Sequence, residues 1–184
     1  MKSIRRFRYW RLPPLFLIIM LSAACGQSPG GDDLREGQLF PPLQLRGLDR
    51  PDVSIDGLRG HWLVMNVWAT WCGPCRQELA GLQQLAERFP SSELQVIGLN
   101  VDADIHVARE FMRDQAISFA NYSDPDMRIA KTLLGIRAFP DTFIIAPDGT
   151  LWRSISGERD WSSDRVIETL RQAIAGRTEV LATL

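Results

Sequence analysis

Two cysteines separated by two residues, Cys72 and Cys75, are the residues of this chain best suited to chemistry. They stand in the segment Trp71-Cys72-Gly73-Pro74-Cys75, after an apolar run and at the start of a helical pattern. A cysteine at a helix N-terminus faces unpaired backbone N–H groups and the positive end of the helix dipole, which favour the thiolate. The segment is therefore predicted to be a redox-active dithiol.

The positions of the two cysteines predict different roles. Cys72, at the start of the helix, is expected to be the attacking nucleophile. Cys75 lies one turn further and is shielded, so we expect it to attack the mixed disulfide and release the product. Pro74 suits the first turn because it lacks an N–H group that would need a partner.

Two other uses of the cysteine pair fit less well. A structural disulfide that closes so small a loop would stabilise the fold by only about 2 kcal/mol. A zinc site needs four ligands, and after Cys25 the chain offers only Cys72, Cys75 and two histidines. His61 lies at the far end of the strand that delivers Cys72, roughly 20 Å away, and His106 falls in a later helix. Both histidines are predicted to be surface residues, and no metal or other cofactor is expected.

The pattern of the remaining chain predicts an α/β fold that positions the dithiol. The apolar run 63–68 reads as a central strand, followed by a helix over 72–89 and a second strand over 94–99. This order makes a parallel βαβ unit. The other predicted elements are a helix over 104–115 with Val107, Ala108, Phe111 and Met112 inward, a shorter helix over 125–134, an antiparallel hairpin of strands 142–146 and 151–155, and a last helix capped among Ser162, Ser163 and Asp164. Together they predict a central mixed β-sheet with helices on both faces.

The first 24 residues are predicted to be an export signal. Basic residues are followed by the apolar run 15–21 and by the small residues Ser22, Ala23 and Ala24. The stretch from Leu12 to Ala24 is 13 residues, short of the roughly 20 needed to span a bilayer. We therefore divide the chain into a signal peptide (1–24), a flexible tether (25–38) and a folded domain (39–184).

Cys25 stands where a bacterial lipobox has its lipidated cysteine. The lipobox leucine, usually three residues before the cysteine, is replaced here by Ser22, with Leu21 one place earlier. Without a lipid, Cys25 would be a free thiol in an oxidising compartment. The sequence thus predicts a lipoprotein anchored to a bacterial membrane, facing the periplasm or extracytoplasmic space; which membrane stays open. The Gly- and Ser-containing tether would reach at most roughly 45 Å.

The charge balance argues against a nucleic-acid partner. Five basic residues and no acidic residue precede Cys25, so the rest of the chain carries 16 basic and 22 acidic residues. A nucleic-acid-binding domain would present a basic face instead.

The segment from Val67 to Glu78 resembles the active-site sequence of the thioredoxin superfamily, and most of all its exported TlpA/ResA-like branch, which includes the cytochrome c maturation thioredoxins. The segment Phe139 to Ile145 and the following Pro147-Asp148-Gly149 match the second family signature. The resemblance implies a thioredoxin-like fold with an insert over 100–124. It also implies that Pro140 is a cis-proline facing the disulfide, and that backbone beside it pairs with an extended substrate segment. The residues implied to support or contact substrate are Trp71, Gly73, Pro74, Phe139 and Pro140, with Trp68 either at this surface or in the core.

The sequence departs from its relatives where they keep an acid to deprotonate the second cysteine. Cytoplasmic thioredoxins have an aspartate six residues before the first cysteine, and here that position is Asn66. The ResA-type branch uses a glutamate in the insert, and alignment puts Ala103 there. Asp102 or Asp104 could take its place, although each could equally cap a helix. The remaining candidates for the proton acceptor are a water molecule and Glu78.

The favoured function is a membrane-tethered protein-disulfide reductase that acts on disulfide-containing exported client proteins, with cytochrome c maturation as one setting. The resemblance implies a DsbD/CcdA-like membrane electron donor, and we expect a monomer. No separate dimerisation domain is visible, which counts against an isomerase. Two competing functions are a thiol oxidase or isomerase on the same fold, and a non-catalytic binding lipoprotein. A peroxiredoxin is disfavoured because Thr70 lies two residues before Cys72, whereas a peroxidatic cysteine follows its threonine by three.

Overall fold

The computed structural model describes residues 34–184. The predicted signal peptide, Cys25 and the tether up to residue 33 lie outside the described residues. Within residues 34–184, no helix is long and apolar enough to cross a membrane.

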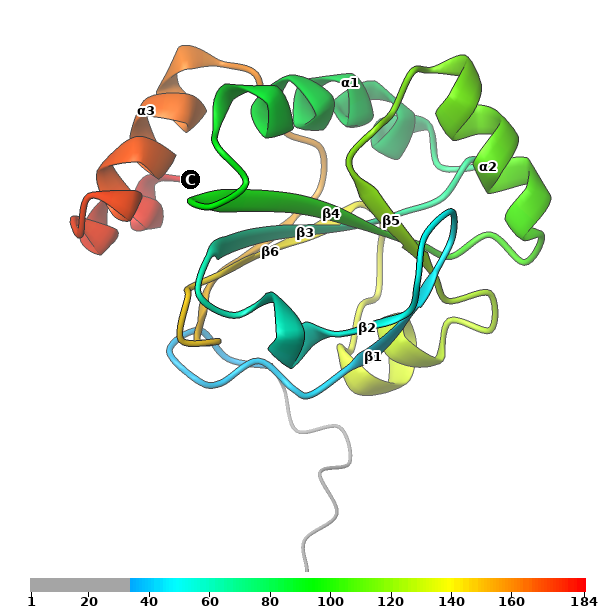
Figure 1. Ribbon diagram of the computed structural model, residues 1–184, viewed down its shortest axis with the longest axis horizontal. Coiled ribbons are helices and arrows are strands. Elements are labelled where there is room, and N and C mark those ends of the chain that lie inside the picture. Colours follow the sequence, from blue (N-terminus) through cyan, green and yellow to red (C-terminus); the bar gives the residue numbers. More distant parts are fainter. Residues whose placement is uncertain (1–33) are drawn as a thin grey trace, which may run out of the picture.

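A seven-stranded mixed sheet forms the centre of the domain, in the order β2-β1-β5-β4-β3-β6-β7 (Figure 1). Strand β3 (Trp62–Trp68), in the interior of the sheet, is buried along its whole length. It pairs in parallel with β4 (Leu94–Asn100) and antiparallel with β6 (Asp141–Ile145). The apolar run that precedes the dithiol is therefore a central strand with covered faces, which confirms the predicted mixed α/β sheet.

The three α-helices, α1 (Gly73–Arg88), α2 (Ile105–Asp114) and α3 (Asp164–Ile174), lie on one side of the sheet (Figure 1). Strands β3, β4 and β5 (Ala120–Ser123) are parallel and adjacent, so two right-handed crossovers place α1 and α2 on the same face. The opposite face carries the 3₁₀-helix η1 (Ile55–Leu58) and the π-helix η2 (Arg128–Leu133). Helices flank both faces of the sheet as predicted, but only the short helices η1 and η2 cover the face opposite the α-helices.

The shorter elements complete the edges of the sheet. They are β1 (Gln44–Gly47), β2 (Val53–Ser54), β7 (Leu151–Ser156) and the 3₁₀-helix η3 (Thr178–Thr183). Strands β6 and β7 pair antiparallel, as the hairpin prediction required. The described end of the predicted tether lies against β7, where the carboxylate of Glu36 accepts hydrogen bonds from Arg153 at 3.1 Å and from Ser154 N at 3.0 Å.

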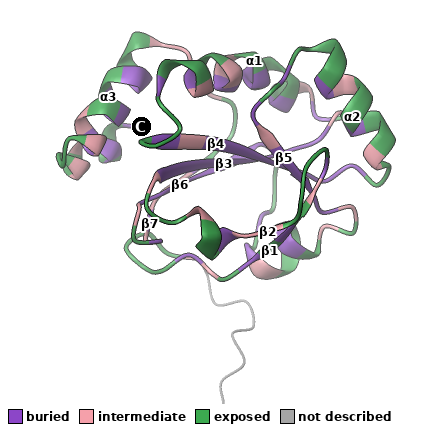
Figure 2. Cartoon of the chain, in the orientation of Figure 1, coloured by how far each residue is buried: buried purple, intermediate pink, exposed green. Residues whose placement is uncertain are grey.

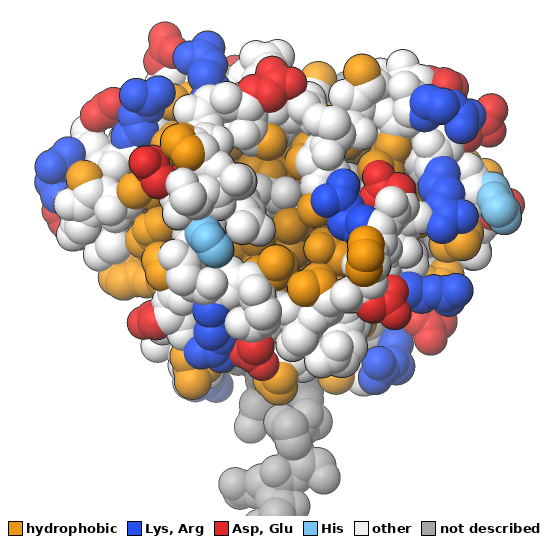
Figure 3. Space-filling model, in the orientation of Figure 1, with side chains coloured by type: hydrophobic (Ala, Val, Ile, Leu, Met, Phe, Trp, Pro, Cys, Tyr) orange, Lys and Arg blue, Asp and Glu red, His pale blue; other side chains and the backbone are white. Residues whose placement is uncertain are grey.

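Burial follows the layers of the fold. The inner strands β3, β4 and β6 are buried, the outer strands β1, β2 and β7 only in part, and the helices bury some residues and expose others (Figure 2). On the face shown in Figure 3, charged side chains of both signs are interspersed around a central hollow lined by apolar side chains.

Two predicted details are wrong. Val107, predicted to point inward on α2, is 46% exposed, whereas Ala108 and Met112 are buried as predicted. The helix packs over the end of the sheet near β5, so its buried stripe is narrow. The helix predicted over 125–134 is the shorter η2. Its start is fixed by Asp124, whose carboxylate accepts hydrogen bonds from Ile129 N and Ala130 N.

A tight contact supports the end of β3 that leads to the dithiol. Trp68 is fully buried, so it belongs to the core, and its indole Nε1 donates to Asn121 Oδ1 at 2.8 Å. Gly98 on β4 leaves room for this pair, because a Cβ atom there would lie 1.9 Å from Asn121 Oδ1 and 2.8 Å from Trp68 Nε1. Only glycine fits at this position.

We predict that Gly98→Ala lowers the free energy of unfolding by about 2 kcal/mol or more, because Asn121 and Trp68 must both move. Urea unfolding measures this. The matched control is Gly57→Ala, where the nearest atom to a new Cβ is Val53 Cγ2 at 3.8 Å, and we expect a change below about 1 kcal/mol. Equal losses in the two variants would contradict the packing argument.

Candidate active site

The two cysteines lie at the start of α1, where the chain leaves β3. Cys72 is the N-cap residue and forms a disulfide with Cys75, with the Cα atoms 5.3 Å apart. The backbone N of Cys75 donates to Cys72 Sγ at 3.2 Å, so the helix N-terminus points a donor at this sulfur. Cys72 is 6% exposed and Cys75 is fully buried. An incoming sulfur can therefore reach Cys72 more readily. Gly73 and Pro74 connect them in the first turn.

An aromatic border and a cis-proline lie beside this disulfide. The Phe139–Pro140 peptide bond is cis, as the family resemblance implied. Asp141 pairs with Val67, which brings the end of the Phe139–Pro140 segment alongside the end of β3. The rings of Trp71 and Phe139 meet edge to face with their centroids 5.7 Å apart. Trp71 is 59% exposed, so it offers an apolar surface next to Cys72.

Glu78 is a buried acid one helical turn beyond Cys75. Its side chain lies on the same face of α1 as Cys75, three residues away, and only 2% of it is exposed. Asn66 Nδ2 donates to Oε1 at 2.5 Å, and Oε2 accepts from Arg159 N and Trp161 Nε1, both at 3.1 Å. The carboxylate therefore joins α1 to β3 and to the segment after β7.

Burial raises the pKa of Glu78 to about 7. The hydrogen bonds from Trp161, Arg159 and Asn66 lower this pKa, but they do not offset the loss of solvent, and the negative charge of Glu158 adds to the rise. A group with this pKa is populated in both protonation states near neutral pH. That is the property required for transferring a proton to or from a neighbouring thiol.

These contacts distinguish the side chains that are candidates for the missing acid. Asn66 occupies the aspartate position of other thioredoxins, yet it holds the Glu78 carboxylate and also donates to Thr142 Oγ1 at 2.9 Å. Ala103 is exposed, and exposed Asp104 caps α2 by accepting from His106 N at 2.9 Å. The Asp102 carboxylate accepts a hydrogen bond from Thr70 Oγ1. Glu78 is the group whose position and pKa suit proton transfer.

The sequence contained a signal that Glu78 is buried, and the structure contains another buried acid, Asp141. A glutamate three residues after Cys75, just before Leu79 on the apolar face of the helix, is out of place on an amphipathic helix unless it is buried for a purpose. Asp141, directly after Pro140, is also buried. Loss of solvent raises its pKa to about 6, although the nearby polar groups of Ser156, Thr142 and Ser154 lower it.

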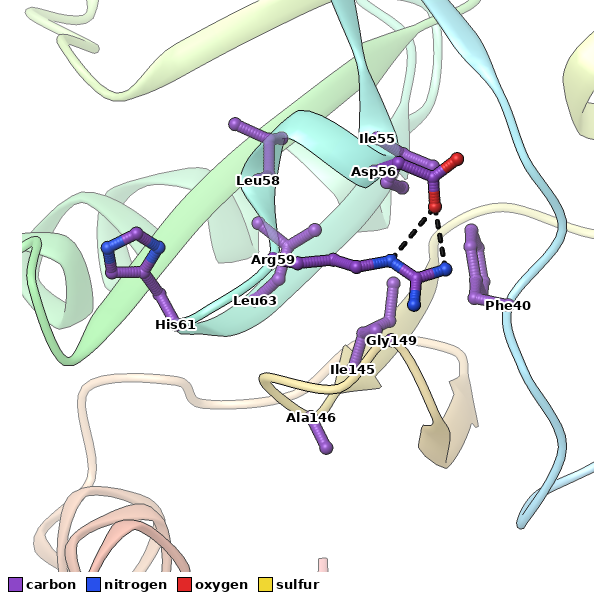
Figure 4. Close-up of a pocket in the computed structure, with 10 residues that line it drawn as sticks. All are labelled: Phe40, Ile55, Asp56, Leu58, Arg59, His61, Leu63, Ile145, Ala146 and Gly149. Carbon is purple, nitrogen blue, oxygen red and sulfur yellow. Dashed lines mark hydrogen bonds and ion pairs between the residues drawn. The ribbon is translucent and has the colours of Figure 1, made fainter.

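The two histidines lie in other parts of the fold than the first turn of α1. His61 precedes β3 at the opposite end of that strand and lines a small pocket beside Arg59, whose guanidinium bonds Asp56 (Figure 4). His61 is partly exposed. His106 is exposed on α2, as predicted.

Known proteins resemble this chain in sequence and in fold. Residues 37–154 match the AhpC/TSA family. The chain is 24% identical over 128 residues to the thiol-disulfide oxidoreductase ResA of Bacillus subtilis, covering 70% of this chain and 71% of that protein. It is 27% identical over 127 residues to ResA of Oceanobacillus iheyensis, covering 67% of this chain and 66% of that protein. A solved structure of a putative thiol:disulfide interchange protein DsbE from Chlorobium tepidum matches 79% of this chain and 99% of its own with a TM-score of 0.68, at 27% identity.

We predict a pH-dependent loss of stability that Glu78→Gln removes. The unfolded chain releases the Glu78 proton near pH 4.5, whereas the folded protein keeps it until about pH 7. The folded state therefore binds more protons in this window, and its stability falls as the pH rises. Relative to Glu78→Gln, the oxidised wild-type protein should lose about 3 kcal/mol of unfolding free energy from pH 4.5 to above 7.

Urea unfolding at several pH values measures this difference, with Glu87→Gln on the exposed side of the same helix as the control. The contribution of Asp141 is common to all three proteins and cancels. A pH dependence that is the same in Glu78→Gln as in wild type would show that Glu78 does not titrate near 7.

Proposed function

The chain belongs to the AhpC/TSA family and is a thiol–disulfide oxidoreductase with a thioredoxin-like fold, and we propose that it works as a membrane-tethered reductase of disulfides in exported proteins. The observation that supports this most is the position of the Cys72–Cys75 disulfide. It lies at the N-terminus of α1, beside an exposed aromatic border and one turn from a buried acid with a pKa near 7.

In the proposed reaction the reduced protein passes two electrons to a client disulfide. The Cys72 thiolate attacks one client sulfur, which breaks the client disulfide and releases the other client sulfur as a thiolate. Cys75 then attacks Cys72 Sγ, which re-forms the Cys72–Cys75 disulfide and releases the second client thiolate. Cys75 must lose its proton for this step, and Glu78 is the group we assign to accept it.

The surface around Cys72 suits an extended client segment. Trp71 and half-buried Phe139 offer aromatic contacts on one side of the sulfur. We propose that backbone next to Pro140 pairs with the client, as the family resemblance implies. Such backbone pairing is independent of client side chains, so recognition would depend on an accessible disulfide in an extended segment.

The reducing direction is supported by the Gly73-Pro74 dipeptide, which is that of thioredoxin, whose potential is about −270 mV. A reductant outside the cytoplasm needs electrons, and we propose a DsbD/CcdA-like membrane protein as the donor. A lipid on Cys25 would hold the domain beside that donor at the extracytoplasmic side of the membrane. Apocytochromes awaiting haem attachment are one candidate client class, and the domain would act as a monomer.

We predict that Cys75→Ala accumulates mixed disulfides with client proteins, because Cys72 can still attack but nothing resolves the product. Non-reducing gels and mass spectrometry of the captured adducts in the cell envelope fraction measure this. Cys72→Ala is the matched control and should capture almost nothing. Equal capture by the two variants would show that Cys72 is not the attacking cysteine, and insulin reduction by Cys72→Ser at the wild-type rate would contradict a catalytic dithiol altogether.

The direction of electron flow has its own test. We predict that the potential of the Cys72–Cys75 couple, measured against glutathione or dithiothreitol, lies near about −270 mV rather than near the roughly −120 mV of a strong oxidant such as DsbA. A potential near roughly −120 mV would mark the protein as a thiol oxidase.

A further inference from the structure

Another buried carboxylate, that of Asp102, holds the loop that leads into Cys72. Asp102 follows β4 and is only 4% exposed. Its Oδ2 atom accepts from Thr70 N at 3.0 Å, and its Oδ1 atom accepts from Thr70 Oγ1 at 2.9 Å. Asn100 Nδ2 donates to Oδ2 at 2.7 Å, and Asp102 N donates back to Asn100 Oδ1 at 3.1 Å. One side chain thus binds both the backbone and the hydroxyl of Thr70.

These bonds fix Asp102 near the backbone of Cys72. Cys72 N donates to Ala69 O at 3.2 Å, so residues 69–72 form a turn. Ala69 O belongs to the same peptide group as Thr70 N, which is bonded to Asp102. Standard peptide dimensions then place the Asp102 carboxylate within about 8.5 Å of Cys72 N.

Among residues 34–184, no ion pair involves the Asp102 carboxylate. Its hydrogen-bond donors are neutral, and within residues 34–184 no Lys, Arg or His nitrogen lies within 4.0 Å of its oxygens. A carboxylate so placed repels a thiolate at Cys72, while the helix N-terminus attracts it. Asp102 therefore opposes the helix in setting how readily Cys72 ionises.

We propose that Asp102 is a positioning residue for the dithiol: it fixes the Cys72 loop through Thr70, and its negative charge shifts the redox equilibrium toward the disulfide. Disfavouring the thiolate disfavours the reduced form, which makes the dithiol a better reductant. The inference rests on the dithiol chemistry of the proposed function and deepens it, because it names a feature of this chain that favours the reducing direction.

The test compares Asp102→Asn with wild type in the full chain. Each protein is equilibrated with reduced and oxidised glutathione at fixed pH, and the dithiol fraction is measured after acid quenching and thiol labelling. We expect Asp102→Asn to shift the equilibrium toward the dithiol by about threefold or more, which corresponds to a potential raised by about 14 mV. Cys72 of the reduced variant should also react faster with iodoacetamide at neutral pH.

The control is Asp104→Asn, two residues away in the same loop, where the side chain is exposed and caps α2. It should leave both readouts within twofold of wild type, since its charge is screened by solvent. The other charged side chains around the dithiol are retained in every variant: Arg76 and Glu78 on α1, Arg137 and Asp141 beside Pro140, and Glu158 and Arg159 after β7.

The sign of the shift distinguishes an electrostatic role from a purely structural one. A loop that merely loosened would move Cys72 away from the helix N-terminus, so the equilibrium would stay or shift toward the disulfide. Either result in a folded Asp102→Asn, or an equal shift in Asp104→Asn, overturns the proposal. If Asp102→Asn does not fold, the neutral Asp102→Ser is measured in the same way. Because each shift is measured relative to wild type, this test can succeed or fail whatever the absolute potential of the wild-type dithiol.

Discussion

The burial of the Glu78 carboxylate is the constraint on which the active-site end of this protein depends. A buried carboxylate is costly unless hydrogen-bond donors satisfy it. Here the donors come from β3, through Asn66, and from the segment after β7, through Arg159 and Trp161. Asn66 extends the network to β6 by donating to Thr142. The strands that carry the dithiol and the cis-proline are therefore connected to α1 through one acid, whose pKa that burial raises to about 7.

Three groups act electrostatically on the dithiol: the N-terminus of α1, Asp102 and Glu78. The N-terminus of α1 favours a thiolate at Cys72. Asp102, fixed before that helix, disfavours it. Glu78 lies on the other side, next to the buried Cys75, and suits the removal of a proton there. The two cysteines thus experience different surroundings although only two residues separate them, which is what an attacking and a resolving cysteine require.

The sequence was a good guide wherever the structure is decided by local pattern. The apolar run of β3, the amphipathic α1 and the Cys72–Cys75 spacing predicted the βαβ unit and the dithiol, and the family resemblance supplied the cis Pro140. Glu78 could be raised only as one candidate among several, because its burial depends on Asn66 and Trp161, which are distant in sequence. Val107 was misjudged because helical periodicity does not tell how much of a helix the sheet covers. The roles of the signal peptide and of Cys25 stay predictions.

The measurement that tests this account most directly is the pH dependence of disulfide formation in the reduced protein. Stopped-flow reaction with oxidised glutathione separates attack by Cys72 from the later closure by Cys75. If Glu78 accepts the Cys75 proton, the rate of closure in wild type rises with pH through a midpoint near 7, and Glu78→Gln closes more slowly and lacks this midpoint. A Glu78→Gln variant that closes at the wild-type rate with the same midpoint would contradict the assignment of Glu78 as the proton acceptor.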